Sequence, residues 1–177
     1  EFVEKNVAEA ERSDCWSKIT LQWLEILDKA LGEKYRAITS RNLILFVPTS
    51  FDQAVSLFDY AESSLQEMQK VLGDLTSMRQ TGPLSIVVFE DAHEYANYVS
   101  PSDPEIEFVQ TKGVCLRGPY THIAMRRTYM DDMRKTILHE VAHACLSDLT
   151  LPIWLEEGIA QTAEQAESRP WHRFALD

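Results

Sequence analysis

The chain has 177 residues, of which 45% are hydrophobic, and it carries a formal net charge of −11 at pH 7. This length and composition predict a single domain over residues 1–177 with a packed core. No apolar run is long enough to span a membrane, and the negative charge argues against a nucleic-acid partner, whose phosphates require a basic face. The charge itself favours solubility, with a preference for cationic substrates as the sharper alternative.

The residue pattern predicts an α+β fold in which a sheet packs over a helix that carries the candidate site. Apolar spacings of three and four residues indicate helices, and short apolar runs that end at Gly or Pro indicate strands. In chain order we expect a helix over 14–31, a strand over 42–47, a helix over 50–72, a strand over 84–90, a helix over 91–99, a loop over 101–108, a hairpin of strands 113–116 and 121–126, a helix over 128–149 and a last helix from Pro152.

The three cysteines predict neither a disulfide framework nor a zinc knuckle. Cys15, Cys115 and Cys145 are widely spaced and form no CxxC pair, so buried free thiols are expected. The chain starts at Glu1 without a methionine, so its natural start can lie further upstream. Cytoplasmic and exported locations therefore both stay open.

The most informative motif is HEVAH, residues 139–143, in the predicted helix over 128–149. Two histidines four residues apart lie on one face of a helix and can bind one metal ion, and Glu140 is then placed to take a proton from water. A chance match is expected on the order of once in a hundred from composition alone. No glycine or proline interrupts the segment, which gives the motif the helical context that this chemistry needs.

A third ligand is expected from the segment LPIWLEEGIA, where Pro152 suits the first turn of a helix and residues 153–155 are predicted to pack. Glu156 and Glu157 are adjacent, so they point about 100° apart and cannot both bind the same ion. The helical wheel alone does not decide between them, because Glu156 shares the more apolar face and Glu157 a mixed face that suits a polar cleft. Other third ligands fit worse, because leucine stands at positions 146 and 149, where a HExxHxxGxxH protease carries glycine and histidine, and Asp148 lies one position out of that register without a glycine turn.

On these residues the chain resembles the gluzincin metallopeptidases of the MA clan. HEVAH followed by W-L-x-E-G-x-A is similar to the pattern of M1-type aminopeptidases, and the short connection is similar to minimal gluzincins and to uncharacterised bacterial MA-like domains. The resemblance is strong over 128–165, looser over 84–127 (peptidase core 84–165), and does not reach the N-terminal helical segment 1–42. A G-x-M-E-N motif is absent, so aminopeptidase specificity is not implied.

The resemblance implies a zincin-like fold, in which a small mixed sheet packs over the active-site helix and a glutamate-bearing helix follows. It implies one zinc ion per chain, held by His139, His143 and Glu157, with Glu140 as the general base of peptide-bond hydrolysis. The choice of Glu157 follows from its place directly before Gly158, a small residue expected to let the two helices approach closely. A tyrosine or histidine that stabilises the oxyanion is also implied.

For that last role His172 is the downstream candidate, with a flexible terminal histidine as the alternative, and Tyr120 and Tyr129 are weaker candidates upstream. Gln161, one turn beyond Glu157, is a candidate to hydrogen-bond a ligand histidine or is simply a surface residue. By analogy with gluzincins, the strand over 121–126 is expected to form the sheet edge that pairs with an extended substrate.

The predicted function is therefore zinc-dependent hydrolysis of a peptide or protein substrate. The alternative is a catalytically inactive zincin-like domain that acts as a binding or scaffold module. Substrate specificity, endo- or exopeptidase action, latency and oligomeric state are left open by the residues.

Overall fold

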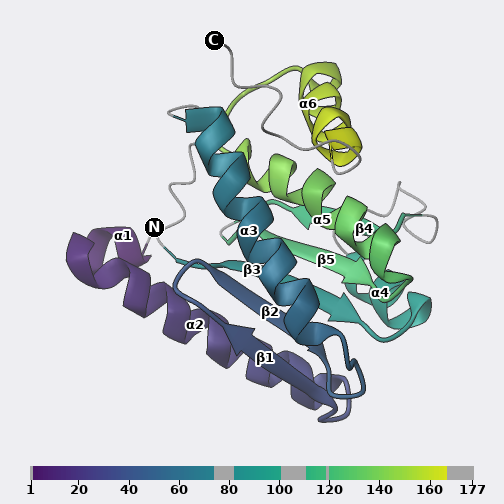
Figure 1. Ribbon diagram of the computed structural model, residues 1–177. Helices are drawn as coiled ribbons and strands as arrows, with labels where there is room; N and C mark the ends of the chain where they lie inside the picture. The colour runs from purple at the N-terminus through teal and green to yellow at the C-terminus, as the bar shows by residue number, and fades with distance from the viewer. Residues whose placement is uncertain (1, 74–81, 101–110, 119, 167–177) are drawn as a thin grey trace.

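The computed structural model describes residues 2–73, 82–100, 111–118 and 120–166, which form an α+β fold around a five-stranded mixed sheet (Figure 1). The strands lie in the order β1-β2-β3-β5-β4. Among the described residues, no helix is both long and apolar enough to cross a membrane. The elements are α1 (Phe2–Asn6), α2 (Glu9–Ala30), β1 (Tyr35–Thr39), β2 (Leu43–Pro48), α3 (Ala54–Leu72), β3 (Leu84–Phe89), α4 (Ala92–Val99), β4 (Gly113–Leu116), β5 (His122–Arg126), α5 (Met130–Cys145) and α6 (Ile153–Ala166).

Most elements expected from the sequence are confirmed, and two were missed. The first missed element is α1, and the second is β1, an edge strand in which only Tyr35 is fully buried, so its sequence lacks the alternation of a half-buried strand. Helix α3 begins at Ala54 rather than at residue 50, and Gly73 with φ 53° ends it. The expected loop over 101–108 lies outside the described residues.

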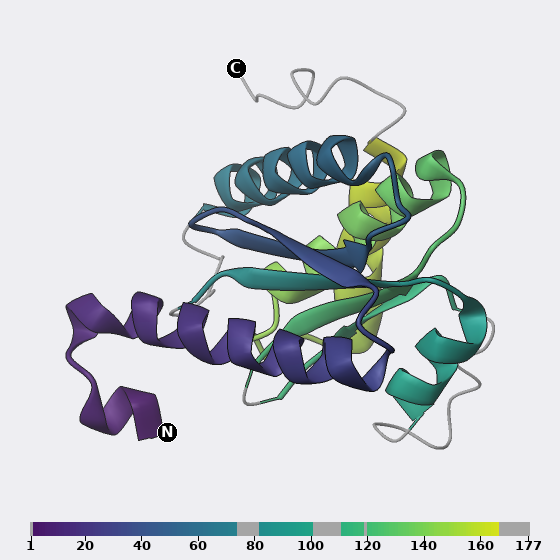
Figure 2. The same cartoon turned by 90° about the horizontal axis from the view of Figure 1, so that it is seen from below.

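The sheet is covered on both faces, which explains the continuous apolar runs of its central strands. Every residue of β2 and β3 is buried. Helices α3, α5 and α6 share one core with the first face, and α2 and α4 share a second core with the other (Figure 2). Strands buried on both faces lose the polar alternation of a one-sided sheet.

The edge of the sheet near the candidate site is β4, and the expectation that residues 121–126 form it is wrong. Strand β5 pairs in parallel with β3 on one side and antiparallel with β4 on the other, so it lies inside the sheet. Its central residues, Ile123, Ala124 and Met125, are buried, whereas all of β4 is half-buried. A hairpin sequence does not reveal which of its strands pairs inward, because that depends on the contact with β3.

Strand β4 runs alongside α5 in the same direction. A Cβ atom at Gly113 would lie 2.5 Å from Cγ2 of Thr136, the Cys115 backbone hydrogen-bonds to Glu140, and the Arg117 side chain reaches the backbone carbonyl of His143. Successive residues of the strand thus meet successive turns of the helix. This register places the end of β4 beside the HEVAH motif.

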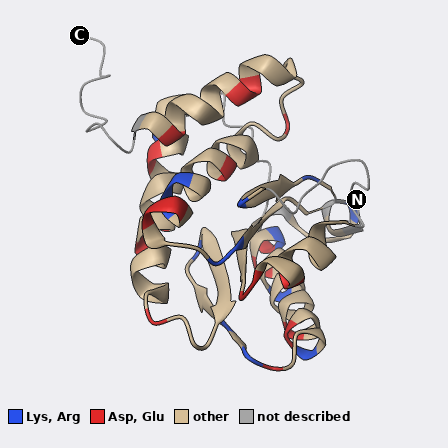
Figure 3. Ribbon diagram, turned by 90° about the vertical axis from the view of Figure 1, so that its right-hand side faces the viewer, with Lys and Arg blue, Asp and Glu red and all other residues tan. Residues whose placement is uncertain are grey.

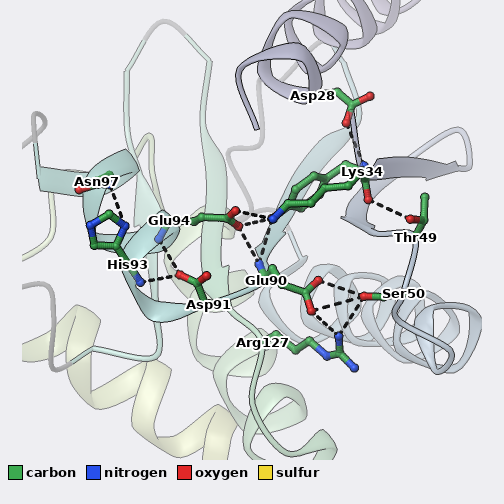
Figure 4. Close-up of polar contacts among 11 residues, drawn as sticks. Asp28, Lys34, Thr49, Ser50, Glu90, Asp91, His93, Glu94, Asn97 and Arg127 are labelled. Atoms are coloured by element: carbon green, nitrogen blue, oxygen red, sulfur yellow. Dashed lines mark hydrogen bonds and ion pairs between the residues drawn. The ribbon is translucent and has the colours of Figure 1, made fainter. Parts of the chain in front are cut away.

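A polar network joins the segments that follow β2, β3 and β5 (Figure 4). Nη1 of Arg127 donates to Oε1 of Glu90 at 2.8 Å and to Oγ of Ser50 at 3.2 Å. Glu94 accepts a bond from Nζ of Lys34 at 2.7 Å, which raises the pKa of that amine and lowers the pKa of the Glu94 carboxyl against its burial. The network anchors the chain just after β5, where it turns into α5.

The close approach of β4 to α5 yields a stability prediction. Gly113→Ala should lower the free energy of unfolding by about 1–3 kcal/mol, because the new methyl group meets Thr136, whose hydroxyl is fixed by a 2.9 Å bond to the Asp132 carbonyl. Urea unfolding measures the change. Gly118→Ala is the matched control, since no atom lies within 4 Å of a Cβ there, and equal stability of both variants would contradict the packing described.

Candidate metal centre

The structure brings His139, His143 and Glu157 together where α5 and α6 pack against each other. One possible ligand atom from each residue lies within 4.8 Å of the others. The two histidine Nε2 atoms are 3.2 Å apart, and the Glu157 oxygens lie 3.4 Å from Nε2 of His143 and 3.7 Å from Nε2 of His139. The two histidines are one turn apart on α5, and the glutamate comes from α6.

These separations fit a shared zinc ion. Ligand atoms about 2.1 Å from a tetrahedral zinc are separated from one another by about 3.4 Å. The 3.2 Å between the two Nε2 atoms lies near that value, as do the distances from His143 to Oε1 of Glu157, 3.4 Å, and from His139 to Oε2 of Glu157, 3.7 Å. Two imidazoles and one carboxylate also form the donor set of catalytic zinc sites that keep one coordination position open.

The other ring nitrogen of each histidine faces a second carboxylate. Nδ1 of His143 donates to Oε1 of Glu156 at 2.8 Å, and Nδ1 of His139 lies 3.4 Å from Oε2 of Glu164. The His143 contact is a well-formed hydrogen bond, whereas Nδ1 of His139 is buried and lacks a hydrogen-bond partner among the described residues. Such carboxylates orient the ring and direct Nε2 to the metal.

Of the two alternatives for Gln161, a partner of a ligand histidine or a surface residue, the structure shows the second. Its side chain is exposed, and Glu156 and Glu164 lie at the two Nδ1 atoms instead. Glu164 is seven residues from Glu157 and hence on the same helix face. This seven-residue spacing is the signal in the sequence that could have identified Glu164.

The adjacent acids Glu156 and Glu157 take different positions. Glu156 is only 6% exposed and contacts the Nδ1 side of His143, while Glu157 is partly exposed and faces both Nε2 atoms. Three packing expectations for this helix need correction. Ile153 and Trp154 do not pack but are 77% and 72% exposed, and Gly158 does not serve close helix approach, since a Cβ there would meet nothing within 4 Å.

Glu140 is the buried acid of the site. Burial raises the pKa of its carboxyl to about 7, a hydrogen bond with the Cys115 backbone opposes that rise, and the negative charge of Glu157 adds to it. Burial and, after it, the neighbouring His139 ring lower the pKa of His143 to about 4. His143 is therefore neutral at pH 7, the form that binds metal.

The tyrosine candidates for oxyanion stabilisation lie elsewhere, and His172 is outside the described residues. The Tyr120 hydroxyl bonds the Pro83 carbonyl and lies 2.9 Å from Oγ of Ser85, and its ring stacks on Trp16 of α2, the helix on the opposite sheet face from α5. Tyr129 is the N-cap of α5 and 85% exposed, about 15 Å along the helix from His139.

Arg117 is a site residue that sequence reasoning missed. Its guanidinium forms an ion pair with Glu156, with Nη1 3.2 Å from Oε2. No local pattern could identify it, because only the alignment of β4 with α5 brings residue 117 to residues 143 and 156.

No protein-family model matches the chain, and no curated protein matches it at a significant level. The gluzincin resemblance therefore rests on the motif residues alone, and the function has to be argued from the site.

The geometry predicts that His139 and His143, but not His93, are required for zinc binding. The purified chain should bind one zinc ion, and His139→Ala or His143→Ala should weaken binding by about a hundredfold or more, because two remaining ligands hold zinc poorly. Elemental analysis and competition with a chelator measure this. His93→Ala is the matched control, since this exposed histidine of α4 contacts Asn97. Equal zinc content in all variants would contradict the site.

The raised pKa of Glu140 predicts a pH-dependent stability in metal-free protein. Between about pH 4.5, the ordinary value, and about pH 7, the folded state holds a proton that the unfolded state has lost. This contribution to stability declines as the pH rises through that range and is gone above it. Glu140→Gln lacks this effect. In the presence of chelator, the free energy of unfolding of the variant should therefore rise relative to that of wild type as the pH rises, by on the order of 3 kcal/mol between pH 4 and pH 8. A difference that stays constant with pH would contradict the raised pKa.

Proposed function

We propose that this protein is a zinc-dependent peptidase that hydrolyses peptide bonds. The observation that carries the proposal is a buried Glu140 carboxyl, with a pKa near 7, that follows His139 in α5 and is within electrostatic reach of Glu157, where His139, His143 and Glu157 could hold one ion. A structural zinc site needs no such acid, because its ligands fill the coordination sphere. When bound, zinc lowers the pKa of water from about 16 towards 7 and polarises a carbonyl group.

Glu140 supplies the proton transfer. Burial holds the pKa of the Glu140 carboxyl near 7 in the metal-free protein, so this group can accept and release a proton close to neutral pH. Glu140 would take a proton from the water molecule as the water oxygen bonds to the carbonyl carbon. Glu140 would then pass this proton to the amide nitrogen, so that the C–N bond breaks and the amine leaves. The Cys115 backbone fixes the carboxyl through its hydrogen bond.

The exposed edge of β4 is the place where an extended substrate would bind. Among the described residues β4 pairs with β5 only, so its other side carries backbone groups that pair with no strand, although the one at Cys115 bonds Glu140. The contact of Cys115 with Glu140 means that a peptide added at this edge would pass beside the general base. A peptide or protein substrate in extended form is therefore the proposed partner.

Hydrolysis of an unstructured protein such as casein tests the proposal. Glu140→Gln keeps the size of the side chain but cannot accept the proton, so activity should fall about a hundredfold to ten-thousandfold while zinc content is unchanged. Glu67→Gln, on an exposed position of α3, is the matched control.

Wild-type cleavage by Glu140→Gln would refute the role of the base. If wild type binds zinc but cleaves neither casein nor a peptide library, the alternative of an inactive binding or scaffold module replaces the proposal.

A further inference from the structure

We propose that Arg117 is a positioning residue of the metal centre that acts through Glu156 and fixes the orientation of His143. The inference rests on the proposed zinc site and assigns a role to a residue outside the HEVAH and LEEG segments. Arg117 directly follows β4, Glu156 lies in α6 and His143 in α5, so the three side chains join three elements.

The contacts form a chain from guanidinium to carboxylate to imidazole. Both terminal nitrogens of Arg117 contact Glu156, with Nη1 bonded to Oε2 at 3.2 Å and Nη2 paired with Oε1. The same Oε1 accepts the Nδ1 proton of His143 at 2.8 Å. Nη2 also lies 3.5 Å from the His143 carbonyl oxygen, so Arg117 reaches both the carboxylate that orients the ring and the backbone that carries it.

Burial makes this pairing necessary. The Glu156 side chain is only 8% exposed, and a buried carboxylate that loses its cation is strongly unfavourable. The planar fork of arginine binds both carboxylate oxygens and leaves little rotational freedom. Glu156 is therefore held away from the Nε2 side of the rings, where Glu157 lies, and is fixed where it aligns His143.

Positioning and simple charge repulsion predict opposite effects on metal binding. A cation near a divalent ion repels it, so if Arg117 acted only by its charge, removal would tighten zinc binding. If Arg117 acts by holding Glu156, removal frees the carboxylate and the ring it orients, and zinc binding weakens. The sign of the change distinguishes the two.

Zinc affinity of the purified full chain, measured by competition with a chelator, is the test. Arg117→Ala should bind zinc about tenfold more weakly, and Glu156→Ala at least as weakly, within the range for loss of groups that orient ligands. Arg117→Ala should have no further effect in the Glu156→Ala background, because Arg117 acts through Glu156. Arg117→Lys keeps the charge without the fork and should lie between Arg117→Ala and wild type.

The matched control is Lys112→Ala. Lys112 precedes β4 and pairs with Asp132 in the first turn of α5 at 3.1 Å. It therefore also links this strand to α5, but at the end of the helix away from the histidines. Its zinc affinity should equal that of wild type. An equal loss in Lys112→Ala would show that any strand-to-helix ion pair has this effect and would overturn the inference.

Unchanged or tighter zinc binding by Arg117→Ala would also overturn it. If Arg117→Ala does not fold, Arg117→Lys decides, and wild-type affinity in that variant refutes the requirement for the fork. The proposed function fails separately: wild type that binds no zinc refutes the metal site itself, whereas wild type that binds zinc with an insensitive Arg117 refutes only this inference.

Discussion

The packing of α6 on α5 concentrates negative charge in a small volume, and the chemistry of the site depends on that constraint. Glu156, Glu157 and Glu164 approach two imidazoles from α6, and Glu140 is buried on α5. Like charges this close repel strongly where water is excluded. Burial is the main cause of the elevated pKa of Glu140, the charge of Glu157 adds to it, and the ion pair with Arg117 compensates the charge of Glu156. In the proposed metal site, a divalent cation bound by the two histidines and Glu157 would compensate the remaining negative charge. Acidic residues also occur on several other helices of the described part of the chain (Figure 3).

The rest of the fold supplies rigidity to this arrangement. Two cores cover the sheet, and the central strands contain only buried residues. The Arg127–Glu90–Ser50 contacts fix the chain after β5, so α5 starts from an anchored point and returns along β4. That return path aligns Gly113, Cys115 and Arg117 with Thr136, Glu140 and His143 in turn. The alignment of β4 with α5 thereby fixes the strand edge relative to Glu140 and the two histidines.

Local patterns made the helices other than α1 and the histidine pair predictable, whereas the features that depend on long-range pairing could not be predicted. HEVAH could be interpreted because helix geometry alone places residues 139 and 143 on one face. Arg117 could not be predicted as a site residue, because its role follows from the alignment of β4 with α5. The edge strand could not be predicted either, because pairing with β3 determines which strand of the hairpin lies inside the sheet. Strand β1 was missed since its exposed residues weaken the alternation. Trp154 was expected to pack because it is apolar, but the face of α6 towards α5 is set by Glu156, Ala160 and Ala163.

The two nitrogens of imidazole explain how adjacent glutamates serve one site. Nε2 and Nδ1 lie on opposite sides of the ring, so Glu157 faces one and Glu156 binds the other although the two residues point in different directions. The protonation states follow the same division. His143 is already neutral at pH 7 and needs to lose no proton to bind zinc, whereas Glu140, with a pKa near 7, is partly protonated in metal-free protein. The pKa of Glu140 falls when a cation binds beside it, because opposite charge favours the carboxylate. In the proposed enzyme, metal binding would therefore convert the buried acid into the base that hydrolysis requires.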